Sequence, residues 1–514
     1  MAITPTISVP DWRRAPLVSF CSLCACVYLA GNANAELEFV PAIAGGVAHT
    51  DNLTLASEDK EPQTVYEVIP SFRLAQKSPR VTSTASYRAE GYHYQERGEN
   101  SVYNFINGDL RVAPDPDNFF LDLGASRDRT LVDPRVPVPS SSLPITTNLV
   151  NRDQAYFGPA FTYPLGTNVT ADGGFRRTLI RYNEQDAGTP FAHDYDFDEA
   201  AFALDNYRKQ RGLTWATRYA SQKTEYTSFP SYEYRQASVE LGAWAGPQMR
   251  VFGSGGKESA WDKPFDPSLA DSFWEVGVAT RTDARITAEL AAGQRSFGSS
   301  RRVEVGIKFE HGSLRLQHSD APTTQRPQSE QPVGPYIGSS GVGQPGISAP
   351  PSSSTGNGGT TAEVPPDLLT NLSVAERYLL RLSTMTLAFD LPRTELSLVA
   401  FDEQREQRIR LDGTPLPDES QTGVSLSALR RFGARTSLVL GVTNNHVESA
   451  VSAAQDWQLR SLTVNYDIGP RTRMSLEYAY TSQDSNLVGA GFDYSANVVT
   501  LLVTRTFNHS VRDK

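Results

Sequence analysis

The chain has 514 residues, of which 39% are hydrophobic, and it carries a formal net charge of −10. This acidity argues against a nucleic-acid partner, because such a partner requires a basic footprint. The three cysteines, Cys21, Cys24 and Cys26, all lie within the first 35 residues. The remainder of the chain can therefore form neither a disulfide nor a thiolate metal site.

Residues 1–35 have the pattern of a secretory signal peptide. Arg13 and Arg14 supply positive charge, an apolar run extends from residue 15 to residue 30, and Ala33-Asn34-Ala35 provides the small residues of a cleavage site. A twin-arginine signal fits less well, because the residues after Arg14 depart from that motif. A lipoprotein signal also fits less well, because the apolar run continues past Cys26.

From residue 36 to residue 507 the sequence repeats one pattern, which is an alternating strand, a tight polar turn and a second alternating strand. In the clearest copy, Met474, Leu476 and Tyr478 fall on one side of a strand, while Arg473 and Glu477 fall on the other. Because no helical segment is available to cover the apolar face, that face is expected to meet lipid. The sequence predicts an all-β fold, an antiparallel transmembrane outer-membrane β-barrel. A secreted propeller or solenoid is the alternative.

Ten short turns punctuate this pattern, and they are rich in the residues that tolerate tight reversal. They lie at residues 77–80, 113–118, 164–168, 207–212, 246–249, 282–284, 310–313, 390–394, 431–435 and 467–471. Ten hairpins with one extra strand at each end predict about 22 strands, within a range of 18 to 24. An even number leaves both termini on one side, which we expect to be periplasmic.

Charged residues that alternate with apolar ones predict the lining of the lumen. Leu213 and Tyr219, for example, would face lipid with Arg218 inward. A charge at the lipid midplane costs about 2–4 kcal/mol, so these charges should point to water. The predicted lumen-lining residues are Arg88, Glu90, Asp122, Arg218, Glu289, Arg295, Arg473 and Glu477.

One segment interrupts the strand pattern. Residues 321–373 contain nine prolines and eight glycines, a composition that cannot bury a core. We expect a disordered extracellular loop between two strands, and a loop that folds inward and narrows the pore is the alternative. The barrel is expected to span residues 36–507, which leaves residues 508–514 as a C-terminal tail.

No motif predicts an enzyme. The run that ends at Lys257 looks like a phosphate-binding loop, but Val251 replaces the required glycine and Glu258 replaces Ser or Thr. No H-E-x-x-H pair is present, and no sequence-local motif ties the histidines expected at strand ends or loops to a nucleophile. These histidines are His49, His93, His193 and His446. We therefore predict neither catalytic residues nor a cofactor.

Asp194, Asp196 and Asp198 alternate in a way that could suit a divalent cation. A calcium loop requires glycine at its sixth position, however, and this chain has Glu199 there. We expect an acidic, solvated surface loop and predict no metal site.

The N-terminal third resembles a known family. His49-Thr50-Asp51-Asn52-Leu53 is followed by an acidic loop, by Val65-Tyr66-Glu67-Val68-Ile69-Pro70 and by Tyr87-Arg88-Ala89-Glu90-Gly91-Tyr92. With Asn118-Phe119-Phe120-Leu121-Asp122, this pattern resembles the PEP-CTERM system-associated outer-membrane proteins over residues 37–130. Such proteins tend to be encoded in species with exosortase sorting and exopolysaccharide clusters, and the family has no established activity. The resemblance implies a Gram-negative outer-membrane barrel related to those associated with exopolysaccharide export.

Two functions are compatible with these features. The favoured hypothesis is a passive, porin-like conduit or export-associated channel for polysaccharide or small solutes. A transporter with a plug domain is not expected, because strand pattern begins at Glu36. The alternative is a structural or adhesive surface barrel whose loops bind envelope polymers. Either function implies outer-membrane lipid and lipopolysaccharide as partners, and the sequence leaves the oligomeric state open.

The composition of residues 321–373 generates a first test. Deletion of residues 325–363 should leave a membrane-inserted barrel, because the segment completes neither flanking strand and long surface loops add little to stability. The mobility difference between unheated and boiled samples on a gel measures assembly. If the loop narrows the pore, the deletion also raises single-channel conductance. A deleted chain that no longer assembles would make the segment a structural part of the barrel.

Overall fold

A computed structural model describes thirteen ranges of the chain, and the predicted signal peptide lies outside them. The described residues are 36–131, 143–146, 149–182, 194–206, 212–227, 231–260, 271–280, 285–324, 376–410, 415–449, 454–485, 493–507 and 509–511. No helix within these ranges is long and apolar enough to cross a membrane.

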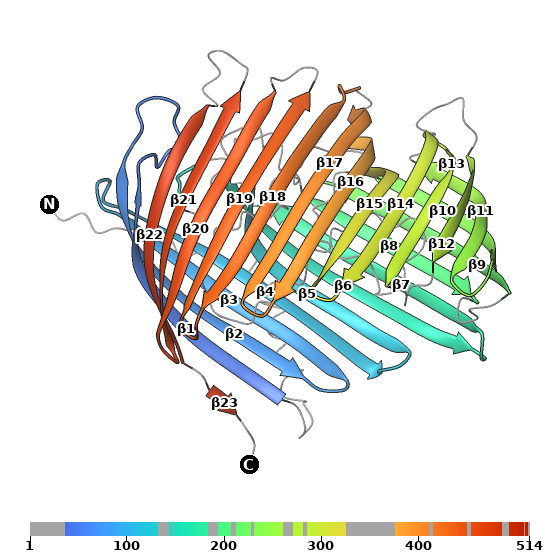
Figure 1. The fold of residues 1–514 in the computed structure, drawn as a ribbon, viewed down its shortest axis with the longest axis horizontal. Helices are drawn as coiled ribbons and strands as arrows, with labels where there is room; N and C mark the ends of the chain where they lie inside the picture. Colours follow the sequence, from blue (N-terminus) through green and yellow to red (C-terminus); the bar gives the residue numbers. More distant parts are fainter. Residues whose placement is uncertain are drawn as a thin grey trace.

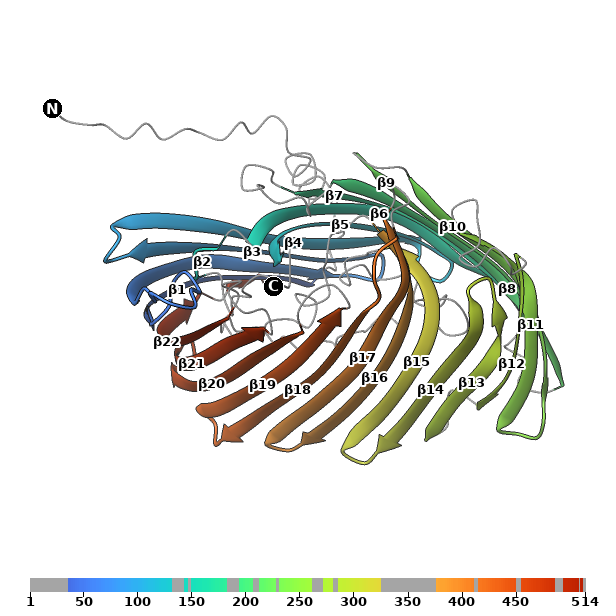
Figure 2. The ribbon, with the colours of Figure 1, turned by 90° about the horizontal axis from the view of Figure 1, so that it is seen from above.

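The fold is a closed ring of 22 antiparallel strands with one short additional strand (Figures 1 and 2). The strands are β1 (Glu36–Thr50), β2 (Gln63–Lys77), β3 (Val81–Tyr94), β4 (Glu99–Asp115), β5 (Phe119–Leu131), β6 (Leu149–Leu165), β7 (Val169–Tyr182), β8 (Tyr195–Asp205), β9 (Leu213–Tyr226), β10 (Tyr232–Trp244), β11 (Met249–Ala260), β12 (Ser272–Thr280), β13 (Ile286–Arg295), β14 (Gly298–Phe309), β15 (Gly312–Thr324), β16 (Glu376–Leu391), β17 (Thr394–Arg410), β18 (Glu419–Phe432), β19 (Thr436–Ser449), β20 (Gln455–Gly469), β21 (Thr472–Ser485), β22 (Tyr494–Thr506) and β23 (His509–Val511).

Closure of the ring comes from pairing between its first and last long strands. Residues 42–50 of β1 pair with residues 498–506 of β22, so neither strand is left with an open edge there. An open edge would expose unpaired backbone groups, which lipid cannot satisfy. The predicted 22-stranded antiparallel barrel is thereby confirmed.

Eight of the ten predicted turns fall between consecutive strands, and those at 207–212 and 282–284 lie largely or wholly outside the described residues. Gly246 and Gly433 lie in two of the eight with φ angles of +89° and +81°, where a side chain would be strained. The start of β1 and the end of β22 lie at the same end of the barrel as these turns, because the number of strands is even.

The outer face of the barrel carries an apolar belt. Leu213 on β9 is 75% exposed, Leu241 on β10 is 65% exposed and Val102 on β4 is 64% exposed. Large apolar side chains at this exposure would be unfavourable in water, whereas lipid is a solvent that matches them. The belt therefore indicates that the barrel lies in a membrane.

The loop between β1 and β2 bridges the closing seam. The backbone N–H of Asn497 donates to Asp51 Oδ1 at 2.7 Å, and the Asn497 side-chain amide donates to Asp51 Oδ2 at 2.7 Å. Asn52, which is fully buried, donates from Nδ2 to the carbonyl of Ser495 at 3.0 Å. The first loop thus fastens β1 to β22 beyond their backbone ladder.

Two further loop segments pack near this seam. Leu53 is fully buried in a cluster with Val65, Tyr94 and Leu143, the last of which lies between β5 and β6. Arg97, between β3 and β4, donates to Glu61 with a 2.7 Å contact from Nε to Oε1. This hydrogen bond holds the pKa of Glu61 below its ordinary value.

Three sequence-based boundaries were wrong. Residues 321–324 belong to β15 rather than to the predicted 321–373 loop, because they continue its pairing with β16. The rest of that loop lies outside the described residues up to Glu376. His509–Val511, in the predicted C-terminal tail, pairs with residues 37–39 of β1. Asp196 and Asp198 lie within β8 rather than in a surface loop, because arginines opposite them compensate their charge.

Close approach of neighbouring strands generates a second prediction. A Cβ atom added at Gly293 on β13 would overlap the carbonyl oxygen of Trp274 and lie 2.7 Å from the Glu275 Cα. A Cβ atom added at Gly253 on β11 would lie 3.8 Å from its nearest neighbour, the carbonyl oxygen of Glu275. Gly293→Ala should therefore destabilise the barrel by at least about 1–3 kcal/mol, because backbone cannot yield like a side chain. Gly253→Ala should leave it unchanged. Heating curves of gel mobility measure both, and equal behaviour of the two variants would refute the argument.

Candidate functional site

The inner wall of the barrel carries several ion pairs, among them Arg218–Glu240 and Arg295–Glu258. Of the eight predicted lumen residues, Arg218, Glu289 and Glu477 lie on strand faces opposite to exposed apolar neighbours. Arg218, for example, alternates with Leu213 and Tyr219, which are 75% and 42% exposed. Contact between these eight side chains and a solute stays a prediction.

Arg88 and Arg111 are the accessible cations of β3 and β4. Arg88 Nε lies 3.0 Å from Glu90 Oε1, and its guanidinium stacks 4.5 Å from the centre of the Phe105 ring. Arg111 forms a bidentate pair with Asp122, with Nε 2.6 Å from Oδ1, and stacks 4.6 Å from the Phe120 ring. The two arginine side chains remain 45% and 47% exposed, so they can still meet a passing solute.

A buried charge ladder crosses β9, β10 and β11. Arg218 Nη1 lies 3.0 Å from Glu240 Oε2, and Arg250 Nη1 lies 2.7 Å from Glu240 Oε1. The Glu240 carboxylate is almost fully buried between the two guanidinium groups. One carboxylate is thus shared by two arginines, and Glu289 interacts electrostatically with Glu240 and Arg250 of the same group.

Arg295 and Glu258 form the most enclosed ion pair of the described residues. Arg295 Nη2 lies 2.6 Å from Glu258 Oε2, and the Tyr234 hydroxyl donates to the same oxygen at 2.9 Å. The Ser296 backbone N–H donates to Glu258 Oε1 at 2.6 Å, while Phe273 flanks the guanidinium. Complete satisfaction of the carboxylate makes this cluster a structural brace rather than a solute contact.

The remaining predicted residues lie elsewhere on the wall. Glu289 meets Arg302 with a 3.1 Å contact, and Arg302 also reaches Glu275 at 3.2 Å. Arg473 Nε lies 2.7 Å from Asp467 Oδ1. Glu477 is buried and interacts electrostatically with Glu67 on β2. The eight residues thus line several strands and do not converge on one point.

Sequence reasoning missed the partners of these charges. Arg111 shares a strand face with Tyr103, Phe105 and Asp109, opposite Val102 and Ile106, so alternation along β4 could have found it. In the sequence, Glu258 stands out only as a mismatch to a phosphate-loop motif. Glu258 and Arg295 are 37 residues apart in the chain, so their pairing could not be predicted without the positions of the strands that carry them.

The described residues contain no group of three or more His, Cys, Asp or Glu side chains placed to hold a metal ion. The chemistry that the inner wall can supply is electrostatic and aromatic contact.

No protein-family model matches the chain, and no curated protein matches it. Among solved structures, the siderophore receptor PirA from Pseudomonas aeruginosa is similar with a TM-score of 0.42 and 10% identity, over 91% of this chain and 80% of that one. OccK2 (OpdF) from Pseudomonas aeruginosa is similar with a TM-score of 0.35 and 9% identity, over 92% and 98%. A loop-deletion mutant of OmpT, an outer membrane protein of Vibrio cholerae, has a TM-score of 0.31 and 9% identity, over 92% and 99%.

The closed ring, the outer apolar belt and the charged inner wall together make the chain an outer-membrane β-barrel of a bacterium. Helices are absent from the described residues, and lipid-facing segments without helices must be closed barrels.

The brace at Glu258 generates a third prediction. Glu258→Ala should destabilise the barrel by about 3–5 kcal/mol, because it leaves the buried Arg295 charge uncompensated. Glu304→Ala is the control, since its partner Arg315 and Glu304 itself are 45% and 43% exposed, and an exposed pair contributes about 0–1 kcal/mol. Urea unfolding in detergent micelles compares the two. Similar decreases in the free energy of unfolding of both variants would show that burial of the ion pair does not determine the destabilisation.

Proposed function

We propose that the barrel is a passive conduit that carries polar solutes across the outer membrane. The observation that supports this proposal best is the pair of accessible arginines, Arg88 and Arg111, each stacked on an aromatic ring of the inner wall. A guanidinium fork binds carboxylates, and an aromatic ring offers a flat apolar surface to the C–H face of a sugar. This combination suits an acidic carbohydrate.

The finer proposal is export of an acidic exopolysaccharide. It is supported by the resemblance of residues 37–130 to the PEP-CTERM system-associated proteins and by the two arginine–ring pairs on β3, β4 and β5. Arg176 also stacks on a ring, 4.7 Å from the centre of Tyr156, but it is buried, so the solute contacts proposed are those of Arg88 and Arg111. A chain of uronate sugars could move along such a wall by exchanging one contact for the next.

A structural or adhesive barrel is the second candidate. The observation that favours it is the dense pairing of the inner wall, since the Glu258–Arg295 and Glu240–Arg250 pairs are almost fully buried. A wall packed in this way could seal the lumen while the outer loops bind envelope polymers.

Single-channel recording in planar bilayers separates these candidates. The conduit should give a steady open current, and a double variant, Arg88→Gln with Arg111→Gln, should lower the anion-to-cation permeability ratio by a factor of about two or more, because fixed wall charge sets the local counter-ion concentration. Arg235→Gln is the matched control. Arg235 is an exposed arginine of β10 that lies on the outer face, whereas Gln236 and Glu240 of the same strand lie on the inner face.

The substrate class is tested in the same apparatus. An oligosaccharide of uronate sugars should interrupt the current of the natural chain and should do so less in the double variant. A membrane-inserted barrel without any current would reject the conduit and favour the scaffold. A current that neutral and acidic oligosaccharides block equally would reject the acidic substrate.

A further inference from the structure

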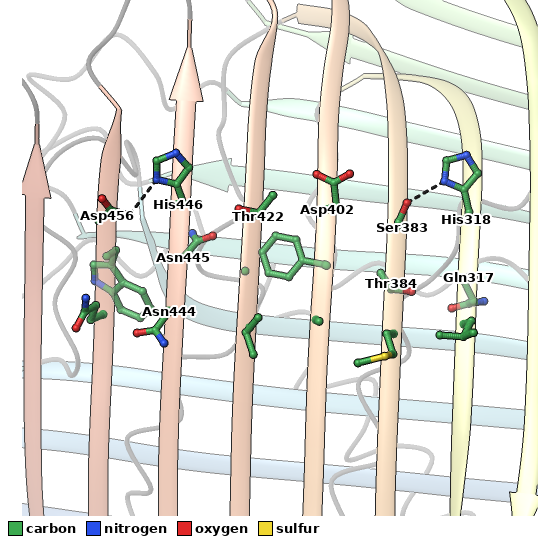
Figure 3. A pocket seen from close by; sticks show the side chains of 18 of the residues that line it. Gln317, His318, Ser383, Thr384, Asp402, Thr422, Asn444, Asn445, His446 and Asp456 are labelled. Carbon is green, nitrogen blue, oxygen red and sulfur yellow. Dashed lines mark hydrogen bonds and ion pairs between the residues drawn. The ribbon is translucent and has the colours of Figure 1, made fainter.

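A groove of about 700 Å³ lies on the outer face of the barrel across β14 to β20 (Figure 3). Its floor contains Leu316, Met385 and Val424, which belong to the apolar belt. One cross-strand row of polar side chains borders this floor on the side away from the short turns. The row consists of His318, Ser383, Asp402, Thr422, His446 and Asp456, each directly opposite the next.

At one end of this row, Ser383 and His318 lie beside Asp320, and the three side chains form a chain of contacts. The Ser383 hydroxyl lies 2.9 Å from His318 Nδ1, and His318 Nε2 lies 3.5 Å from Asp320 Oδ1. Ser383 comes from β16, whereas His318 and Asp320 project from the same face of β15. A hydroxyl, an imidazole and a carboxylate in this order are the parts of an activated nucleophile.

The carboxylate is held in place for such a role. Asp320 is 95% buried, and its Oδ2 accepts a 2.8 Å hydrogen bond from the Arg301 backbone N–H. Within the described part of the chain, Asp320 Oδ1 has no hydrogen-bond partner, and its charged contacts are His318 Nε2 and, at 3.9 Å, Arg381 Nε. A buried carboxylate oxygen 3.5 Å from an imidazole nitrogen can orient the ring and stabilise its protonated form.

The other described histidines lack this arrangement. His446 bonds to Asp456, whose side chain is 61% exposed, and His93 bonds to Asn100. Among the residues that the structure describes, His318 is the histidine with both a serine hydroxyl and a buried carboxylate beside it.

The position of the site identifies the class of its substrate. The polar row lies where the apolar belt ends, which is the depth at which lipid ester bonds meet headgroups, and the groove below it can take an acyl chain. Asp402 and Asp456 on the row favour a headgroup that carries an ammonium over a polyanionic one. We propose that Ser383, His318 and Asp320 form an esterase site for a zwitterionic glycerophospholipid of the outer membrane, an activity separate from conduction through the lumen.

The reaction proceeds in two balanced steps. Ser383 Oγ attacks the ester carbonyl carbon while His318 takes the hydroxyl proton. The bond to the lysophospholipid oxygen then breaks, and His318 returns the proton to that leaving alkoxide. Water next attacks the acyl-serine with His318 as base, which releases the fatty acid and restores Ser383. Asp320 is a positioning residue, which acts on the reaction through His318.

The test uses the full chain in mixed micelles of detergent and phosphatidylethanolamine. The natural chain should release fatty acid and lysophospholipid, and a fluorophosphonate probe should label Ser383, as located by mass spectrometry. Ser383→Ala should abolish both signals. His318→Asn should lower the rate about 10²–10⁴-fold, and Asp320→Asn should lower kcat by a similar factor while KM stays constant.

Ser420→Ala is the matched control, because Ser420 lies on the same outer face of β18, opposite Gln404 and Glu448, and should be neither labelled nor required. Heat-modifiable gel mobility shows that each variant is folded. The proposal is overturned if folded natural chain releases no more fatty acid than folded Ser383→Ala and Ser383 stays unlabelled. Cleavage of lipopolysaccharide esters without cleavage of the phospholipid would overturn the assigned substrate.

Discussion

The interaction on which the whole structure depends is the backbone hydrogen bond between β1 and β22. Lipid offers no partner to a peptide N–H or C=O, so a sheet in a membrane must satisfy every such group itself. Twenty-one hairpin or loop connections bring consecutive strands together, but the last pairing joins residues 448 to 464 positions apart. The Asp51–Asn497 contacts and the pairing of His509–Val511 with β1 reinforce this single long-range join.

Closure separates two environments, and the side chains follow that separation. Apolar residues such as Leu213 and Leu241 face lipid, while carboxylates and guanidinium groups pair on the opposite face. Buried pairs of this kind contribute little net stability, because desolvation offsets attraction, yet breaking one is costly. They therefore fix strand positions inside a wall in which Arg88 and Arg111 are ion-paired but about half exposed.

Alternation and turn chemistry made the architecture predictable from sequence, because both depend on neighbouring residues. The same reasoning could place Arg295 on a face but could not identify Glu258 as its partner, since that depends on how β11, β12 and β13 pair. Ser383 and His318 are 65 residues apart, across the Pro- and Gly-rich segment, so no local motif joins them. Strand ends were also less predictable: residues 321–324 look like loop by composition but complete a ladder with β16.

Disulfide cross-linking tests whether β1 and β22 close the ring in one register. All native cysteines lie in residues 1–35, so a chain that starts at residue 36 provides a cysteine-free background. Ala44 and Thr504 are directly opposite, whereas Ala44 and Val503 are offset by one position and face opposite sides. The double variant Ala44→Cys with Thr504→Cys should cross-link readily under mild oxidation. The double variant Ala44→Cys with Val503→Cys should not. Cross-linking of the offset pair alone, or of neither pair in a folded barrel, would contradict closure in this register.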